Sequence, residues 1–311
     1  MANQSTLGLE KISTQSHIQL LDEHAEFPLI EMRCGDAHCV VSLYGGQVLS
    51  YQSSRQNVLW HNRYAEFKQG KAIRSGIPIC WPWFGRYTSP PVSQEAERDT
   101  TIFRPSHGFA RTQFWRIESA HSTASLTKLT LGLADNGETR AMWPHRFQLR
   151  LVIQLDEVAF KLMLHVENSG TSDFYMSGAL HSYFAVSSID GIDISGLENQ
   201  PYVDQLTSAE HMQHDVIRFT EEVDRVYQTA TPRLCLNDKA QNKRITVNSF
   251  GHKHWVIWNP WHSKASSMSD IATDHWRQFV CMETAIANSE PVCVPANKSY
   301  AFGLEIHDAS V

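Results

Sequence analysis

Alternation of apolar and polar residues with a period of two is the feature that most constrains how this chain can fold. Residues 29–33 and 39–43 alternate in this way on either side of a Gly35-Asp36 turn signal, which is typical of a β-hairpin. Residues 148–156 and 158–166 form two longer alternating runs separated by a short acidic connection. Their recurring β-branched and apolar side chains predict a second hairpin.

Shorter patterns of the same kind recur along the rest of the chain. Further strands are expected at residues 46–51, 114–118, 126–131, 174–184, 244–247, 254–258, 279–283 and 300–306. About a dozen short strands without a convincing long amphipathic helix favour an all-β sandwich of antiparallel sheets over βαβ units. No composition shift or Pro/Gly/Ser-rich linker divides the 311 residues, so a single domain spanning residues 1–311 is expected.

The charge balance limits the kinds of partner. Hydrophobic residues make up 42% and charged residues 19% of the chain, values close to those of globular proteins. The formal net charge of -6 at pH 7 gives no general attraction to nucleic acid or to an anionic membrane. An anionic small molecule would therefore have to be held by a local basic pocket.

The cellular location is expected to be cytoplasmic. The N-terminal residues lack the basic start and apolar run of a signal peptide, and no stretch approaches the roughly 18 apolar residues of a transmembrane helix. The six cysteines contain no CxxC pair and lie in apolar runs. They are interpreted as buried free thiols.

Three segments without clear periodicity, residues 86–106, 199–223 and 261–277, are interpreted as long loops. Loops of this length in a compact domain are usually functional.

The densest cluster of unusual residues occupies positions 70–85, where aromatic side chains follow Lys71 and Arg74. Trp and Phe faces stack well on sugar rings, and the two cations could meet an anionic group. The alternative interpretation is an aromatic core whose basic side chains extend to the surface. A second cluster, Ser106-His107-Gly108-Phe109-Ala110-Arg111, would lie at the mouth of a sandwich, and the planar guanidinium of Arg111 suits a phosphate or a pair of hydroxyls.

His181 and Glu283 each stand inside an apolar run. Such a histidine is more often a hydrogen-bonded core residue than a catalyst, whereas a glutamate is almost never fully buried unless it is paired or used. If both strands belong to one sheet, an imidazole with an unperturbed pKa of about 6.5 and a carboxyl with a pKa of about 4.3 could act together as acid and base.

Other chemistries have little support in the sequence. His252 and His254 place two imidazoles on one strand face, but no third ligand stands at a characteristic spacing, so no metal is expected. The chain has no GxSxG elbow and no P-loop, and Tyr44-Gly45-Gly46-Gln47 is a turn rather than a GxGxxG fingerprint. Acyl transfer and nucleotide binding are therefore disfavoured.

Taken in order, the clusters resemble the aldose 1-epimerase (galactose mutarotase-like) superfamily, in particular its glucose-6-phosphate 1-epimerase branch, over nearly the whole chain. The motifs that carry the resemblance are IRSGIP at 73–78, HGFAR at 107–111, LHSYF at 180–184, GLE at 196–198, WNPW at 258–261 and CME at 281–283. The combination is highly specific, whereas any one motif alone is not.

The resemblance implies a large antiparallel β-supersandwich that binds sugar across one concave sheet and uses no cofactor. It implies an epimerase (mutarotase) that interconverts the anomers of a hexose 6-phosphate, with His181 as general acid and Glu283 as general base. It further implies that Arg74 and Arg111 bind substrate and phosphate and that Asp224 binds the sugar.

His107 belongs to the same set of expected substrate contacts, and Ser106 is a candidate contact. Two positions depart from the family pattern, because Ser75 stands where a second glycine is usual and Ser106 where some relatives carry glutamine. Glu283 is expected to begin ionised and His181 protonated, so activity should fall at both pH extremes. The expected assembly is a monomer or weak dimer. The alternatives are a non-catalytic carbohydrate-binding or regulatory β-sandwich and an aldose 1-epimerase acting on unphosphorylated sugars.

Overall fold

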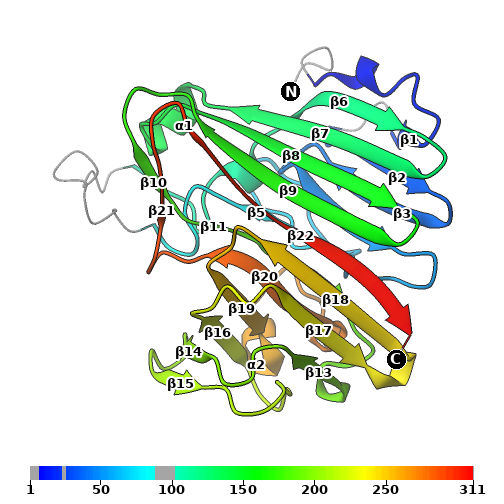
Figure 1. The fold of residues 1–311 in the computed structure, drawn as a ribbon, viewed down its shortest axis with the longest axis vertical. Coiled ribbons are helices and arrows are strands. Elements are labelled where there is room, and N and C mark those ends of the chain that lie inside the picture. Colours follow the sequence, from blue (N-terminus) through cyan, green and yellow to red (C-terminus); the bar gives the residue numbers. More distant parts are fainter. Residues whose placement is uncertain (1–6, 23–25, 88–101, 311) are drawn as a thin grey trace.

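Two eight-stranded sheets form most of the molecule (Figure 1). This computed structural model describes residues 7–22, 26–87 and 102–310. The first sheet has the order β13 (Ile192–Ser195), β17 (Arg233–Asp238), β18 (Lys243–Phe250), β22 (Ser299–Ser310), β9 (Ala159–Asn168), β8 (Phe147–Asp156), β7 (Leu126–Ala134) and β6 (Arg116–Ser122).

The second sheet carries the residues of interest. Its order is β15 (Glu210–Met212), β14 (Pro201–Asp204), β16 (Val223–Tyr227), β19 (His254–Asn259), β20 (Phe279–Ile286), β11 (Gly178–Leu180) and β5 (Ile79–Cys80), and β12 (Tyr183–Ala185) also pairs with β20. All the strand pairs of this sheet are antiparallel.

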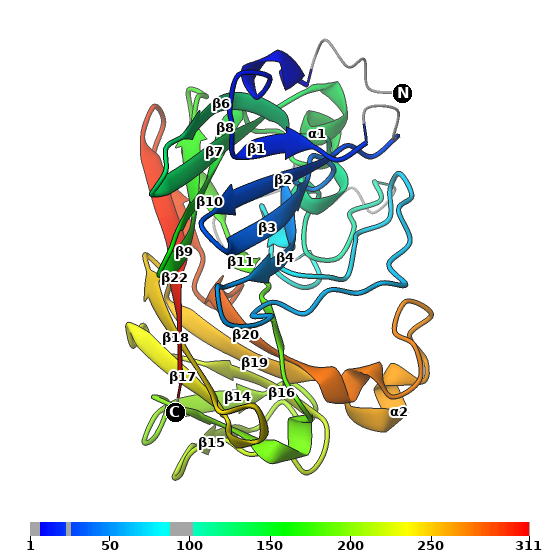
Figure 2. The same ribbon diagram turned by 90° about the vertical axis from the view of Figure 1, so that its right-hand side faces the viewer.

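Two smaller sheets complete the fold. One is four-stranded and contains β1 (Ile18–Leu20), β2 (Leu29–Cys34), β3 (Ala37–Ser42) and β4 (Gln47–Gln52), and the other pairs β10 (Phe174–Met176) with β21 (Val292–Val294). Figure 2 shows the four-stranded sheet in blue against the layer that contains β7 and β8. The expectation of an all-β fold of antiparallel sheets is confirmed.

Both predicted hairpins are present. β2 pairs with β3 across the Gly35-Asp36 turn, and β8 pairs with β9 with Leu151 opposite Leu164. Along β8 every second side chain is buried, as the period-two pattern requires. In the core, Tyr51 of β4 stacks on Phe160 of β9, with ring centroids 4.8 Å apart.

Helices are short throughout the described residues. The α-helices are α1 (Gly137–Met142) and α2 (Trp261–Ala265), and the 3-10 helices are η2 (Leu9–Lys11), η3 (Ala110–Thr112), η4 (Ile189–Gly191), η5 (Lys239–Gln241) and η6 (His275–Gln278). None of the helices in the described part of the chain has the length and apolar character that a membrane span requires.

Several segments differ from the sequence-based expectations. Residues 174–184 are three short strands rather than one, because β10 leaves to pair with β21 and the chain breaks again at His181. The segment 199–223 contains the β14–β15 hairpin, whose polar residues concealed its pairing, and 261–277 contains α2 and part of η6. Of the segment 86–106, residues 88–101 lie outside the described residues.

The cysteine prediction was right for four residues and wrong for two. Cys34, Cys39, Cys80 and Cys281 are buried free thiols. Cys293 is exposed, because it is the middle residue of β21 and points away from the buried face that Val292 and Val294 share, and Cys235 is only partly buried.

The segment 70–85 divides between core and cavity. Trp81 is fully buried and packs edge-on against Phe147, with ring centroids 4.6 Å apart, and Trp83 is nearly as buried. The core interpretation is therefore right for these two indoles, whereas Lys71 and Arg74 line a cavity.

Candidate active site

His181 and Glu283 are brought together by neighbouring strands of the second sheet. β11 and β20 pair with Leu180 opposite Thr284, so the residue after β11 lies beside the residue before Thr284. The His181 amide donates to the Pro78 carbonyl at 3.1 Å, and the pairing with β20 is interrupted here, between β11 and β12. As a result, His181 Nε2 lies 3.3 Å from Glu283 Oε1.

Glu283 takes a different position in its strand from the one expected, since the expected strand ended at residue 283. Glu283 lies inside β20, opposite Val256 of β19, rather than near the strand's end. The imidazole stacks on Tyr183, with centroids 4.9 Å apart and an interplanar angle of 13°. It meets Trp258 and His107 edge-on at 5.9 and 5.8 Å. These aromatic contacts fix the plane of the ring.

Burial controls the protonation of the pair. His181 is 8% and Glu283 1% exposed. Burial raises the pKa of Glu283 well above its usual range, with Asp224 adding to the rise and Arg111 opposing it. Burial also lowers the pKa of His181 well below its usual range, and His107, Arg74 and Arg111 reinforce the fall. Burial therefore favours a proton on Glu283 and a neutral imidazole over the expected charged pair.

Two polar atoms of the pair have no protein partner. Within the described part of the chain, Glu283 Oε2 and His181 Nδ1 are buried and make no hydrogen bond. Buried polar atoms are seldom left unpaired, because the desolvation cost is about 1–3 kcal/mol each. Unpaired atoms beside an acid–base pair are the places where a polar ligand can bond.

A basic cavity of about 210 Å³ lies beside the pair, because Tyr183 lines this cavity and also stacks on His181. The cavity is lined by the cations Lys71, Arg74 and Arg111, by the carboxylate of Asp270, and by Ala72, Ile73, Pro78 and Tyr183. An anion would find three cationic side chains in its wall.

The three cations are not equivalent. Arg74 Nε donates to Asp270 Oδ2 at 3.0 Å, and its Nη1 donates to the Tyr183 hydroxyl at 3.1 Å. Lys71 Nζ bonds Glu66 Oε2 at 2.6 Å. Arg111 Nη2 donates to the Ser106 carbonyl at 2.8 Å, and its buried Nε has no partner in the described residues.

The other expected substrate contacts take different positions. Asp224 lies on β16 opposite Trp258, is half-buried, and has a pKa that burial raises to about 6. His107 contacts His181, and burial together with Arg111 and Arg74 lowers its pKa to about 3. Ser106 is exposed and presents its backbone carbonyl to Arg111.

Sequence reasoning missed Tyr183 and Asp270. Tyr183 stands in the LHSYF motif two residues after His181, and that spacing, which repeats a strand face, was the available signal. Asp270 lies in a segment without any pattern, and only the fold brings it to Arg74.

The histidine pair near β19 does not form part of a metal-type cluster. His252 Nε2 contacts the Thr231 carbonyl and His254 Nδ1 accepts from the Ala287 amide. In the described residues, the group of three that does have ligand spacing is His181, Cys281 and Glu283.

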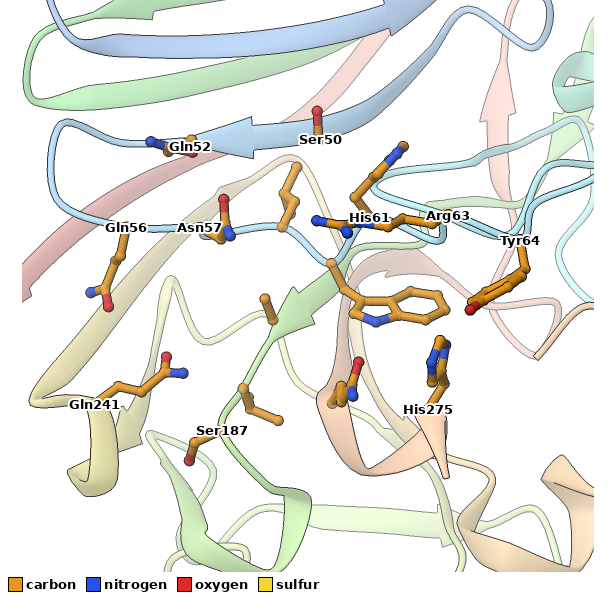
Figure 3. A pocket seen from close by; sticks show the side chains of 15 residues that line it. Ser50, Gln52, Gln56, Asn57, His61, Arg63, Tyr64, Ser187, Gln241 and His275 are labelled. Atoms are coloured by element: carbon orange, nitrogen blue, oxygen red, sulfur yellow. The ribbon is translucent and has the colours of Figure 1, made fainter. Parts of the chain in front are cut away.

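A larger cavity of about 1000 Å³ opens elsewhere on the molecule (Figure 3). Its wall includes Ser50 and Gln52 from β4, and Tyr64 and His275 face each other across one side with ring centroids 5.3 Å apart. It contains neither His181 nor Glu283, so it has no comparable acid–base pair.

Comparison with known proteins agrees with the fold. The sequence profile of the family described as Aldose 1-epimerase matches residues 28–307. The chain belongs to the aldose 1-epimerase family. A relative from Escherichia coli (strain K12), provisionally named glucose-6-phosphate 1-epimerase, is 34% identical over 90% of this chain and 89% of its own length. A protein of Cenchrus ciliaris with the same provisional name is 32% identical over 84% of this chain and 78% of its own.

Solved structures of this aldose 1-epimerase family superpose over most of the chain. A protein from Salmonella typhimurium, provisionally described as a mutarotase, has a TM-score of 0.81 and 30% identity, covering 92% of this chain and 91% of its own. Galactose 1-epimerase from Lactobacillus acidophilus NCFM has a TM-score of 0.70 at 10% identity, covering 94% and 98%. The second likeness shows the galactose mutarotase-like fold alone.

Proposed function

We propose that this member of the aldose 1-epimerase family interconverts the α and β anomers of a hexose 6-phosphate, with glucose 6-phosphate as the expected substrate. The single observation that carries the proposal is the buried His181–Glu283 pair at 3.3 Å beside a cavity lined by three cations. The pair supplies acid–base chemistry and the cations supply recognition of a phosphate. The provisional names of the relatives point to the same substrate.

Ring opening needs one proton removed and one proton donated. With the closed sugar bound, Glu283 takes the proton of the O1 hydroxyl while His181 gives a proton to the ring oxygen. The C1–O5 bond breaks and a C1–O1 double bond forms, which leaves protonated Glu283, neutral His181 and an open-chain aldehyde. Rotation about C1–C2 and the reverse transfers close the ring on the other face. Each positioned group of this kind is worth roughly 10²–10⁴ in rate.

The protonation state that burial favours in the His181–Glu283 pair matches the middle of this reaction. Burial favours neutral His181 and protonated Glu283, which is the protonation state beside the open-chain aldehyde. The charged form of the pair must therefore be stabilised when the closed sugar binds. The sugar hydroxyls contribute hydrogen bonds, and Arg111 favours the Glu283 carboxylate. No step requires an electron acceptor or a covalent adduct.

Arg111 is the first candidate for the phosphate. Unlike Arg74 and Lys71, it makes no ion pair with a carboxylate among the described residues, and its Nε is unpaired. Arg74 donates to both Asp270 and the Tyr183 hydroxyl. It can therefore connect the basic cavity to Tyr183, whose ring stacks on His181. Asp224 and His107 are proposed to bind sugar hydroxyls, and Ser106 remains a candidate contact.

A second candidate substrate follows from the same ion pairs. Because carboxylates already neutralise Arg74 and Lys71, the cavity is less positive than its cations alone suggest. An aldose 1-epimerase acting on an unphosphorylated sugar is the competing proposal. A non-catalytic carbohydrate-binding sandwich is less favoured, since it gives no reason to bury an acid beside a base.

The remaining expectations stay proposals. We propose a single domain, supported by β22, which pairs with β9 and β18 and so joins both halves of the first sheet. A cytoplasmic location is supported by the unpaired buried thiols. A monomer or weak dimer is proposed for the assembly.

Polarimetry of freshly dissolved α-glucose 6-phosphate tests the function. The protein should accelerate the approach to anomeric equilibrium above the buffer background, and should do so with higher kcat/KM than for α-glucose. Equal kcat/KM for both sugars would favour the unphosphorylated substrate, and no acceleration of either would favour the binding protein.

A further inference from the structure

Cys281 completes a set of three metal-type donors with the acid–base pair. His181 Nε2, Cys281 Sγ and a Glu283 carboxylate oxygen all lie within 4.8 Å of one another. Cys281 and Glu283 are two residues apart on β20, so their side chains leave the same face of the sheet. His181 reaches that face from the end of β11. The proposed sugar chemistry gives Cys281 no task.

We propose that these three side chains form an inhibitory site for a thiophilic divalent cation such as Zn²⁺, which binds in place of the sugar. The binding claim stands on the cluster itself. The claim of inhibition rests on the proposed function, because it assumes that His181 and Glu283 perform the proton transfers.

The distance between the His181 and Glu283 donor atoms fits a tetrahedral ion. Zinc bonds to nitrogen and oxygen of about 2.0–2.2 Å place two ligands of a tetrahedron roughly 3.3–3.6 Å apart. The observed distance from His181 Nε2 to Glu283 Oε1 is 3.3 Å. One imidazole, one thiolate and one carboxylate leave a fourth position for solvent, the arrangement of a zinc site open on one side.

The charge also fits a buried site. Cys281 is fully buried and Glu283 nearly so. A dication bound by one thiolate, one carboxylate and one neutral imidazole forms a neutral cluster, which avoids the cost of burying net charge. Binding transfers the thiol proton and the carboxyl proton to solvent and forms the Zn–S and Zn–O bonds, while the imidazole bonds through its free lone pair. No electron transfer is involved.

Access is the same as for the sugar. His181 retains 8% exposure, and a substrate must reach the same imidazole for the proposed reaction to occur. Once bound, the ion occupies the acid and the base together, so turnover stops although no residue is lost. The ion is therefore an inhibitor, and chelation is not expected to reduce the activity of the metal-free enzyme.

The test compares Cys281→Ala with the matched control Cys39→Ala, which removes a fully buried thiol from β3 in another sheet. Both variants should keep wild-type turnover. Zn²⁺ should inhibit the wild type and Cys39→Ala, and EDTA should restore both. Losing an outer-shell partner of a metal site costs about 10–100-fold in affinity, so losing a ligand should raise the inhibitory Zn²⁺ concentration of Cys281→Ala by at least that much.

Cobalt binding provides a readout that does not depend on activity. Titration of the intact protein with Co²⁺ should give a sulfur-to-metal charge-transfer absorption that is present in the wild type and Cys39→Ala but absent in Cys281→Ala. Cys281→Ser is the second variant if the alanine variant does not fold. Wild-type Zn²⁺ sensitivity in the cysteine variants, or no charge-transfer band in the wild type, would overturn the metal site. A clear band in a protein without epimerase activity would instead sustain the site and refute the proposed function.

Discussion

His181 Nε2 lies 3.3 Å from Glu283 Oε1, and both side chains are almost completely buried. Burial disfavours charge on either group and so favours a proton on Glu283 and a neutral His181 imidazole. The proposed reaction passes through the same protonation state beside the open-chain aldehyde.

Replacement of the proposed acid should reduce turnover and spare binding. His181→Asn should lower kcat by roughly 10²–10⁴ because the amide cannot donate a proton to the ring oxygen, while sugar-phosphate binding by calorimetry persists. His254→Asn is the matched control, since it removes a buried histidine from β19 of the same sheet. The control should change stability without changing turnover of the folded fraction. Loss of both binding and thermal stability in His181→Asn would mean that this histidine is a core residue.

Asp224 should set the acid limit of activity. Burial raises its pKa to about 6, so the side chain is neutral below that pH and becomes a charged acceptor for sugar hydroxyls above it. We expect kcat/KM to fall as the pH drops through about 6. Asp224→Asn should have a lower kcat/KM above this pH and should not show the fall below it. The second pKa of a phosphate ester is also about 6, so glucose must be tested in parallel. A fall seen with glucose 6-phosphate alone would belong to the substrate.

The two arginines should differ in what they discriminate. Arg111→Ala should lower kcat/KM for glucose 6-phosphate by roughly tenfold to a hundredfold more than for glucose, since a charge-assisted contact to the phosphate is worth about 1.5–3 kcal/mol, whereas the lost support of the Glu283 carboxylate affects both sugars alike. Arg74→Ala should impair both sugars, because Arg74 also holds the Tyr183 hydroxyl beneath His181. Steady-state kinetics at fixed ionic strength separate the cases. Equal losses on both sugars in Arg111→Ala would remove this residue from phosphate recognition.

Asp270 should oppose phosphate binding. Its carboxylate forms an ion pair with Arg74, and 15% of its side chain is exposed. The same negative charge should repel a phosphate that enters the cavity. Asp270→Asn should lower KM for glucose 6-phosphate by about fivefold, equivalent to about 1 kcal/mol, without a matching change for glucose. Glu66→Gln, at the more exposed pair with Lys71, should have a smaller effect because solvent screens it. A higher KM in Asp270→Asn would show that this carboxylate supports the site.

The sequence carries the local signals of this fold but not its long-range pairings. Alternation located β2, β3, β8 and β9 because burial on one face imposes a period of two. It failed for the β14–β15 hairpin, whose side chains are largely exposed and so follow no burial pattern.

The candidate site divides in the same way. His181 and Glu283 were recognisable because ionisable residues inside apolar runs conflict with their surroundings. The ion pair between Arg74 and Asp270 could not be recognised from the sequence, because contacts between distant segments depend on the folded structure. The opposite pKa shifts of His181 and Glu283 were not predictable from the sequence either, because they depend on burial that composition does not reveal.

The most direct test of the account is the rate of α-to-β conversion of glucose 6-phosphate by Glu283→Gln and wild type at equal folded concentration. The amide keeps the volume of the side chain but cannot accept the O1 proton, so the account predicts a loss of roughly 10²–10⁴ in kcat with unchanged circular dichroism. Turnover at the wild-type rate by the well-folded variant would contradict the assignment of Glu283 as the base.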